Sequence, residues 1–214
     1  MPLSLGDSFD SLECLFEPEG ELRVSFMDLL RLTSARTEFV LRATLEAILR
    51  NPQKISLEID DLLVRDAWRD HLVAATAAAL GHLEEKSSKL WECFDRGTWV
   101  SPQVAAALSA VDPNFVPHAA VRAGVAVRKG AALLATGEEE QRLEYIDLCK
   151  DVSSLYAFLR SVPSKGNFLG EEIEAGCALM AADDYDNGGE IATSWLASLS
   201  DYGILLGLEI GGAR

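Results

Sequence analysis

The chain has 214 residues, of which 49% are hydrophobic and 25% are charged, and its 34 acidic and 19 basic residues give a formal net charge of −15. This composition is typical of a folded globular domain and excludes disorder as the main state. So acidic a chain repels phosphate backbones and anionic lipid, whose binding depends on lysine and arginine, which excludes nucleic acid and membrane surfaces as partners.

The acidic residues are unevenly distributed within what we predict to be a single helical domain, 1–214. Residues 1–30 form an acidic N-terminal appendage, 31–134 a neutral helical core and 135–214 an acidic helical C-terminal part. Residues 1–21 hold six acidic residues and no basic one, unlike a secretory signal, and the longest apolar stretch, 72–81, is too short to span a bilayer. We therefore expect a cytoplasmic protein.

The N-terminal appendage predicts a small β-hairpin. Residues 12–17 and 21–26 flank a turn formed by 18–20, and hydrophobic side chains alternate with polar ones from Leu22 to Phe26, as they do along a half-buried strand. Two strands alone are marginally stable in water, so this hairpin would have to pack on the helices that follow.

From residue 27 onward the hydrophobic period becomes helical. Four charged residues of alternating sign recur every four positions, which places them on one helix face: Glu38, Arg42, Glu46 and Arg50. Thr33 and Ser34 are the predicted N-caps of this helix, and Asn51-Pro52 ends it.

A second long helix is predicted from Asp60 to Phe94, and Gly97 ends it. It contains the alanine-rich tract 74–79. Alanine is the best helix former and is small, so another helix can approach this tract closely.

Proline signatures and apolar periodicity place the remaining helices. Ser101-Pro102 opens a helix to Val111, with Ser101 as N-cap, and Asp112-Pro113 opens one over 116–134, because proline is favoured in the first turn. Thr136 is the predicted N-cap of a helix over 138–159, and shorter helices follow over 170–182 and 190–199. Their predicted inward faces contain Leu143, Ile146, Cys149, Val152, Tyr156 and Leu159, then Ile173, Cys177 and Met180, then Ile191, Trp195 and Leu199.

An internal repeat relates two of these helices. With an offset of 47 residues, 68–74 aligns with 115–121 and matches an aromatic residue, a histidine and an apolar run. This period, and the Asp112-Pro113 turn followed by the small residues Ala119-Ala120, resemble a HEAT repeat over residues 36–134. The resemblance implies a scaffold that binds macromolecules along a curved face. The expected fold class is all-α, either an irregular multi-helix bundle or a short HEAT-like α-α stack.

Two groups of side chains of the types that bind metals are interpreted as structural rather than as metal sites. His71 and His82 are about three helical turns apart and Glu85 follows, but one such set offers too few ligands for a metal centre. The acidic run 183–190 lacks the spacing of a calcium loop, because Ser194 stands where a bidentate glutamate is needed. We expect no metal and no cofactor.

The four cysteines predict neither a nucleophile nor a zinc site, because no pair is closely spaced and none is near a histidine in the sequence. They are Cys14, Cys93, Cys149 and Cys177. Whether the protein is an enzyme is left open, and a non-enzymatic role is favoured.

The candidate partner-binding residues are acidic side chains around two predicted helix ends: Glu171, Glu172, Glu174, Asp183, Asp184, Asp186 and Glu190. Such a surface attracts a basic protein and speeds its association. The sequence thus favours an acidic interaction module that binds a basic protein partner, for example an immunity protein or antitoxin that occludes a basic toxin. Two alternatives stay open: a helical-bundle enzyme or metal-binding protein that uses buried acids and histidines, and a structural subunit or secretion-type chaperone.

Overall fold

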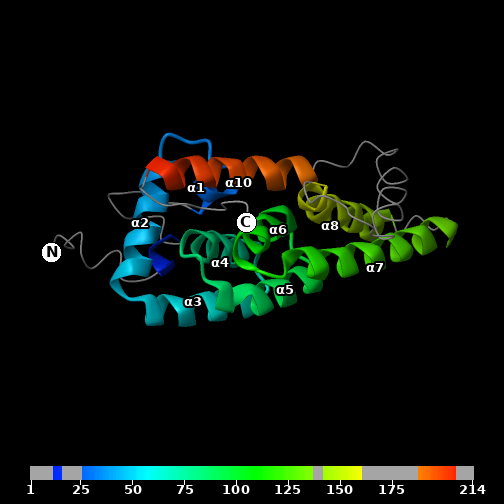
Figure 1. Ribbon diagram of the computed structural model, residues 1–214, viewed down its shortest axis with the longest axis horizontal. Helices are drawn as coiled ribbons and strands as arrows, with labels where there is room; N and C mark the ends of the chain where they lie inside the picture. The colour runs from blue at the N-terminus through cyan, green and yellow to red at the C-terminus, as the bar shows by residue number, and fades with distance from the viewer. Residues whose placement is uncertain (1–11, 16–25, 137–141, 161–187, 206–214) are drawn as a thin grey trace. The chain divides into compact units, whose positions relative to one another are not determined.

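The computed structural model describes residues 12–15, 26–136, 142–160 and 188–205, which form helices and the loops that join them (Figure 1). The predicted all-α fold class is confirmed, and no strand occurs within these ranges. The chain divides into two compact units, residues 1–112 with 195–214, and residues 113–194. The single domain 1–214 stays a prediction.

The first unit is built around α4 (Trp68–Leu80), whose residues from His71 to Leu80 are all buried. Figure 1 shows α4 in the middle of the helices of this unit. The helices that contact α4 are α1 (Met27–Arg31), α2 (Thr37–Arg50), α3 (Pro52–Val64) and α6 (Ser101–Val111), and α5 (Ser87–Arg96) packs on α3 and α6.

The packing of α4 on α6 confirms the prediction for the alanine-rich tract. The alanines of 74–79 are fully buried, and so are Ala105, Ala106 and Ala107 of α6. Small side chains on both helices let the two backbones approach each other, and this contact forms the centre of the unit.

The predicted β-hairpin is wrong for residues 12–15, the part of its first strand that the structure describes. Leu12–Leu15 form a single 3-10 turn, η2, in which both end leucines are buried. Residues three apart lie on the same side of a 3-10 turn, so the two leucines share one buried face. The backbone N–H of Leu12 donates to Glu58 Oε2 at 2.8 Å. Residues 16–25 lie outside the described residues.

The single helix predicted from Asp60 to Phe94 is also wrong, because the structure divides it into α3, α4, a 3-10 turn η3 (Glu84–Lys86) and α5. The backbone is extended at Arg65, which ends α3, and it is left-handed at His82, where φ is 48°.

The helix α3 begins before the predicted start, at Pro52. Asn51, the residue between α2 and α3, is its N-cap, and the Asn51 side chain accepts from the backbone N–H of Lys54 at 3.2 Å.

Two predicted N-caps are misplaced by one or more residues. The helix α2 begins at Thr37, and Ser34 precedes it in a turn in which Ser34 Oγ accepts from the backbone N–H of Arg36 at 3.2 Å. The helix α6 begins at Ser101 itself, with Val100 as N-cap, and the buried Ser101 Oγ caps no backbone N–H. Proline at the second position fixes the start of α6 without help from the serine hydroxyl.

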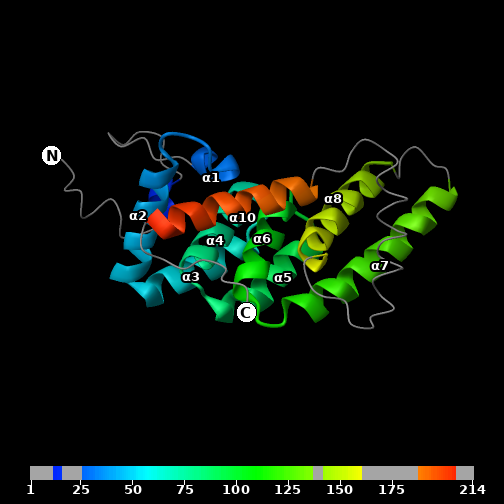
Figure 2. The same ribbon diagram turned by 45° about the horizontal axis from the view of Figure 1, so that its top comes forward.

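The second unit contains α7 (Phe115–Thr136), α8 (Arg142–Leu159) and the beginning of α10 (Gly188–Leu205). The helices α7 and α8 lie side by side and antiparallel (Figures 1 and 2), with Phe115 edge-to-face on Phe158 at 5.9 Å and Lys129 Nζ 2.6 Å from Glu144 Oε1. Tyr145, Cys149 and Val152 of α8 form their buried core with Ala126, Val127 and Leu133.

Both helices of this pair confirm the predicted segments 116–134 and 138–159 within the described residues. The predicted helix 190–199 is confirmed within α10, and its Trp195 and Leu199 are buried as expected. Thr136 is the last residue of α7, and residues 137–141, which it was predicted to cap, lie outside the described residues, as does the predicted helix 170–182.

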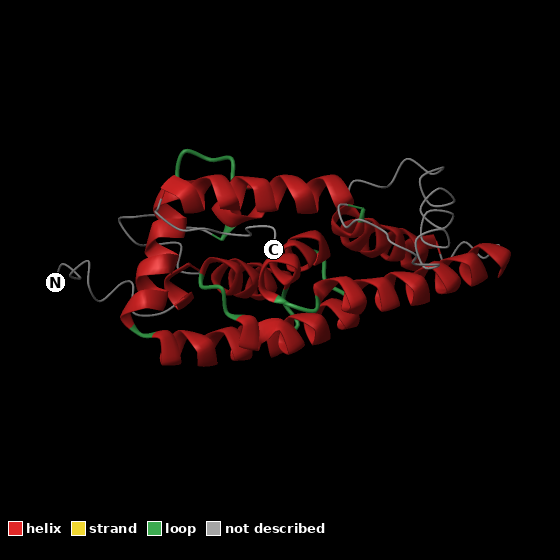
Figure 3. Cartoon of the chain, in the orientation of Figure 1, coloured by secondary structure: helices red, strands yellow, loops and turns green. Residues whose placement is uncertain are grey.

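Figure 3 shows the described elements as helices joined by loops. The repeat units 68–74 and 115–121 begin α4 and α7, respectively. The HEAT-like repeat stays a prediction. Among the described helices, none combines the length and the apolar character needed to cross a bilayer.

Candidate functional site

The predicted acidic surface falls almost entirely outside the described residues. Of its seven residues, only Glu190 is described, and it is exposed in the first turn of α10. The other six are Glu171, Glu172, Glu174, Asp183, Asp184 and Asp186. In all, 15 of the 34 acidic residues and three of the 19 basic residues of the chain lie outside the described ranges. The acidic surface therefore stays a prediction.

The histidines do not share a helix face, because α4 ends at Leu80 and His82 lies exposed in the turn that follows. His71 is buried, and its Nε2 lies 2.7 Å from the carbonyl oxygen of Arg65 while its Nδ1 lies 2.9 Å from Thr98 Oγ1. A carbonyl only accepts, so Nε2 carries a hydrogen and donates it to Arg65. His71 therefore holds the loop between α5 and α6 against α4.

Other side chains considered as ligands or nucleophiles are placed as follows. Cys93 and Cys149 are buried free thiols, and residues 183–187 of the acidic run lie outside the described residues. Within the ranges that the structure describes, no three histidine, cysteine, aspartate or glutamate side chains come together as a metal site would require.

A surface cluster that the sequence analysis missed joins three separate elements. We call it the Trp99 patch, and it consists of Phe26, Trp68, Arg69 and Trp99. The Trp68 ring is its centre, with the Phe26 ring at 5.7 Å and 80° and the Trp99 ring at 5.0 Å and 62° between ring centroids and planes. Both are edge-to-face arrangements, which the quadrupoles of aromatic rings favour.

The loop that presents Trp99 is anchored on both sides of the tryptophan. Gly97 ends α5 with φ at 85°, a conformation that favours glycine because it has no Cβ. The Thr98 hydroxyl is bonded to His71, and Val100 is buried. With both neighbours directed inward, the Trp99 side chain is left at the surface.

Arg69 lies over the rings of the patch. Its guanidinium carbon is 5.3 Å from the Phe26 ring centroid and 5.5 Å from that of Trp68. Other basic side chains of this unit form ion pairs with carboxylates. Arg42, for example, pairs with Glu38 at 2.8 Å. No described carboxylate lies within ion-pair distance of Arg69, so its N–H donors are not used in such a pair.

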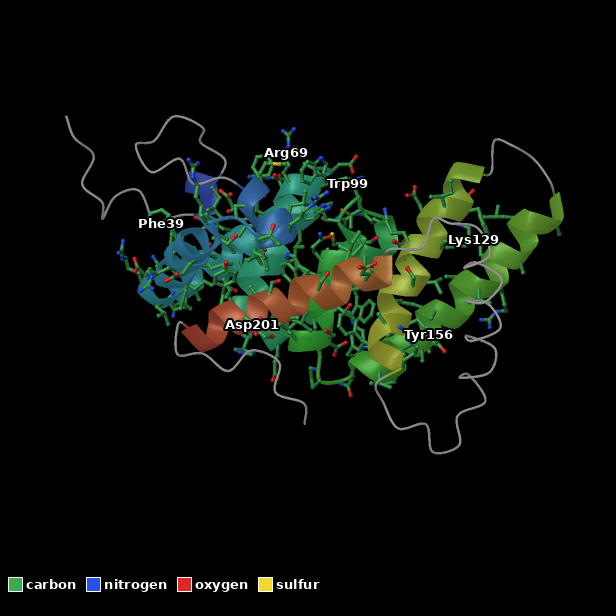
Figure 4. The ribbon with its side chains drawn as sticks, turned by 90° about the horizontal axis from the view of Figure 1, so that it is seen from above. Phe39, Arg69, Trp99, Lys129, Tyr156 and Asp201 are labelled. Carbon is green, nitrogen blue, oxygen red and sulfur yellow. The ribbon has the colours of Figure 1, made fainter. Side chains whose placement is uncertain are left out.

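The exposure of Trp99 sets it apart from the buried tryptophans. Trp91 donates its indole N–H to Asp112 Oδ2 at 2.7 Å, and Trp195 donates to the carbonyl oxygen of Leu29 at 2.8 Å. By contrast, 61% of Trp99 is exposed. Figure 4 shows the labelled Arg69 and Trp99 side chains next to each other at the surface, apart from Phe39.

The sequence holds one signal for this patch, a tryptophan in the short loop 97–100 between two predicted helices, where no hydrophobic period requires it. No protein-family model, curated protein or solved structure matches the chain. The evidence for a function is therefore the geometry and charge of the chain itself.

Proposed function

We propose that the protein is a non-enzymatic protein-interaction module that binds its partner through the Trp99 patch. The observation that supports this proposal is an exposed tryptophan, Trp99, packed against Trp68, over which lies Arg69, an arginine that pairs with no carboxylate of the described residues. Tryptophan and arginine are enriched in protein interfaces, and they account for a large share of the residues whose loss weakens binding most.

The patch is also organised before a partner arrives. The Trp68 ring contacts its two neighbouring rings, Arg69 is stacked, and the bond between His71 and Thr98 fixes the loop that presents Trp99. Side chains that are already ordered lose less conformational entropy on binding, so more of the contact energy contributes to affinity.

Site-specific photo-crosslinking tests this proposal. A benzoylphenylalanine introduced at position 99 of the full chain should form a covalent adduct with one protein partner in the cells from which the sequence derives. The same group at Leu57, which is exposed on α3, is the matched control. With the identified partner, Trp99→Ala should weaken binding by about tenfold or more, while Leu57→Ala should leave it unchanged.

Two results would contradict the proposal. One is the same set of adducts from positions 99 and 57, or none from position 99. The other is an unchanged affinity of the Trp99→Ala variant for the crosslinked partner.

The basic partner predicted from the sequence is a separate proposal, with occlusion of a basic toxin as its concrete form. The acidic residues of this chain would attract the basic partner at long range. The association rate should therefore fall with rising salt much more than the dissociation rate rises. Stopped-flow mixing at several ionic strengths measures both rates. The double variant Glu171→Lys with Asp184→Lys should associate more slowly at low salt, and rates that do not depend on salt would refute the proposal.

A further inference from the structure

We infer that the Trp99 patch binds an acidic, apolar segment of a protein, in which a carboxylate side chain lies close to an aromatic or aliphatic one. This inference rests on the proposed function and names the chemistry of the partner at that site. It is carried by Arg69, which supplies the charge, and by Trp99, which supplies the apolar surface.

Arg69 favours a carboxylate for two reasons. Its guanidinium lies over two aromatic rings and has no carboxylate partner among the described residues, so N–H groups at its edge can form two parallel hydrogen bonds to one carboxylate. An ammonium or guanidinium group of the partner would instead be repelled by Arg69. The patch therefore selects against the lysine-rich segments that the acidic residues of this chain would attract.

Trp99 defines the second half of the ligand. Its exposed indole lies 5.0 Å from the Trp68 ring, which is itself 5.5 Å from the Arg69 guanidinium carbon. The charged and apolar contacts therefore lie within about 10 Å of each other, a distance that about three residues of an extended peptide span. A carboxylate one to three residues from a leucine or phenylalanine meets this requirement.

A polyanion is the other ligand that an arginine and a tryptophan could bind together, through phosphate and through base stacking. The charge of the whole chain opposes it. A net charge of −15 repels a strand that carries one phosphate per nucleotide far more than a peptide with two carboxylates.

Peptide binding to the full chain tests the inference. The probe is the capped, fluorescein-labelled peptide Gly-Ser-Glu-Leu-Phe-Glu-Ser-Gly, and its counterpart has lysine in place of both glutamates. Fluorescence anisotropy at physiological salt should give a Kd below about 1 mM for the acidic peptide and binding at least about tenfold weaker for the basic one. An octathymidylate with the same label should not bind.

Two pairs of variants locate the binding. Arg69→Gln and Trp99→Ala should each weaken binding of the acidic peptide by about tenfold or more. Arg42→Gln removes an arginine that is already paired with Glu38, and Leu57→Ala removes an exposed aliphatic side chain elsewhere, so both controls should bind like the natural chain. Circular dichroism and melting temperature verify that each variant is folded.

The inference is overturned if the acidic peptide does not bind at 1 mM, if the basic peptide or the oligonucleotide binds as tightly, or if Arg69→Gln has no effect. A crosslinked partner at position 99 combined with any of these results leaves the proposed function standing and refutes only the chemistry assigned to the patch. Light scattering addresses a second copy of this chain as the occupant, and a dimer that Arg69→Gln dissociates would also overturn the inference.

Discussion

Three large buried side chains of the described helices use their hydrogen-bonding nitrogens inside the fold. The indole N–H groups of Trp91 and Trp195 each have an oxygen acceptor, and His71 uses both ring nitrogens. A buried donor without a partner would cost about 1–3 kcal/mol, so these bonds are a condition for placing such side chains in the core. Trp99 needs no acceptor within the protein, because its side chain is exposed to water.

Cys93 provides a prediction about reactivity. Burial raises the pKa of the Cys93 thiol from an ordinary 9.0 to about 12, although the neighbouring Arg96 lowers it in part. Only a thiolate attacks alkylating reagents, and at pH 8 the folded chain should hold on the order of 10³-fold less Cys93 thiolate than the unfolded chain. Iodoacetamide labelling, resolved by peptide mass spectrometry, should therefore modify Cys93 far faster in urea than in buffer.

The same shift predicts how stability depends on pH. The folded state holds the thiol proton more tightly than the unfolded state, so this contribution to stability is complete below pH 9 and is lost as pH rises from 9 towards 12. The Cys93→Ala variant should lose less stability than the natural chain as pH rises from 9 towards 12.

The labelling experiment also has an outcome that contradicts burial of the thiol. Equal iodoacetamide labelling rates of Cys93 in buffer and in urea at pH 8 would show that the thiol is not held in the core.

At the scale of elements, the sequence predicts helix starts where a local rule acts and fails where a tertiary contact decides. The proline signatures at Pro102 and Pro113 place the starts of α6 and α7 closely, because proline fits only in a first turn. The break between α3 and α4 depends on the His71 ring, which takes the carbonyl of Arg65 that a continuous helix would have used.

The Trp99 patch could not be predicted for a similar reason. Its residues come from the start of α1, the start of α4 and the loop after α5, which the packing of the first unit brings together. Hydrophobic periodicity describes one element at a time, so it assigns Trp68 to a helix but says nothing about its neighbours. Most of the acidic site predicted from sequence lies in residues that the structure does not describe.

The beginning of α10 gives a prediction at this scale. A Cβ on Gly188 would lie 2.7 Å from Ser153 Oγ and 2.8 Å from Ser154 Oγ on α8, and too close to the carbonyl oxygen of Lys150. The Gly188→Ala variant must therefore push the two helices apart, and it should lose about 1–3 kcal/mol of unfolding free energy in urea titrations.

Glu190→Gln is the control for this experiment. Glu190 lies two residues further along the same helix and is exposed, so its substitution should change the unfolding free energy by less than about 0.5 kcal/mol. Similar values for the two variants would mean that α10 does not approach α8 as closely as the structure shows.

At the scale of the whole molecule, the net charge is distributed unevenly along the sequence. The described residues include 16 of the 19 basic residues, whereas 15 of the 34 acidic residues fall in the remaining segments. Most of the net negative charge, which acts at long range, therefore comes from residues other than the described ones, whereas Arg69 and Trp99 act through short-range contacts. Steering and recognition of a partner can be altered by separate substitutions.

Packing in the first unit joins two helices that are far apart in the sequence, α1 and α10. The indole N–H of Trp195 donates to the carbonyl oxygen of Leu29, 166 residues away in the sequence, and both residues are buried. Trp195→Phe keeps most of the ring volume but leaves that carbonyl without its donor. We expect a loss of about 1–3 kcal/mol in unfolding free energy, measured by circular dichroism in urea.

Trp99→Phe is the matched control, because it makes the same chemical change on an exposed side chain and should cost less than about 0.5 kcal/mol. If Trp195→Phe cost as little as Trp99→Phe, the hydrogen bond between α10 and α1 would contribute little to stability. The expected contrast also has a kinetic consequence. A bond that closes so long a loop forms late, so the loss should appear mainly as faster unfolding rather than slower refolding.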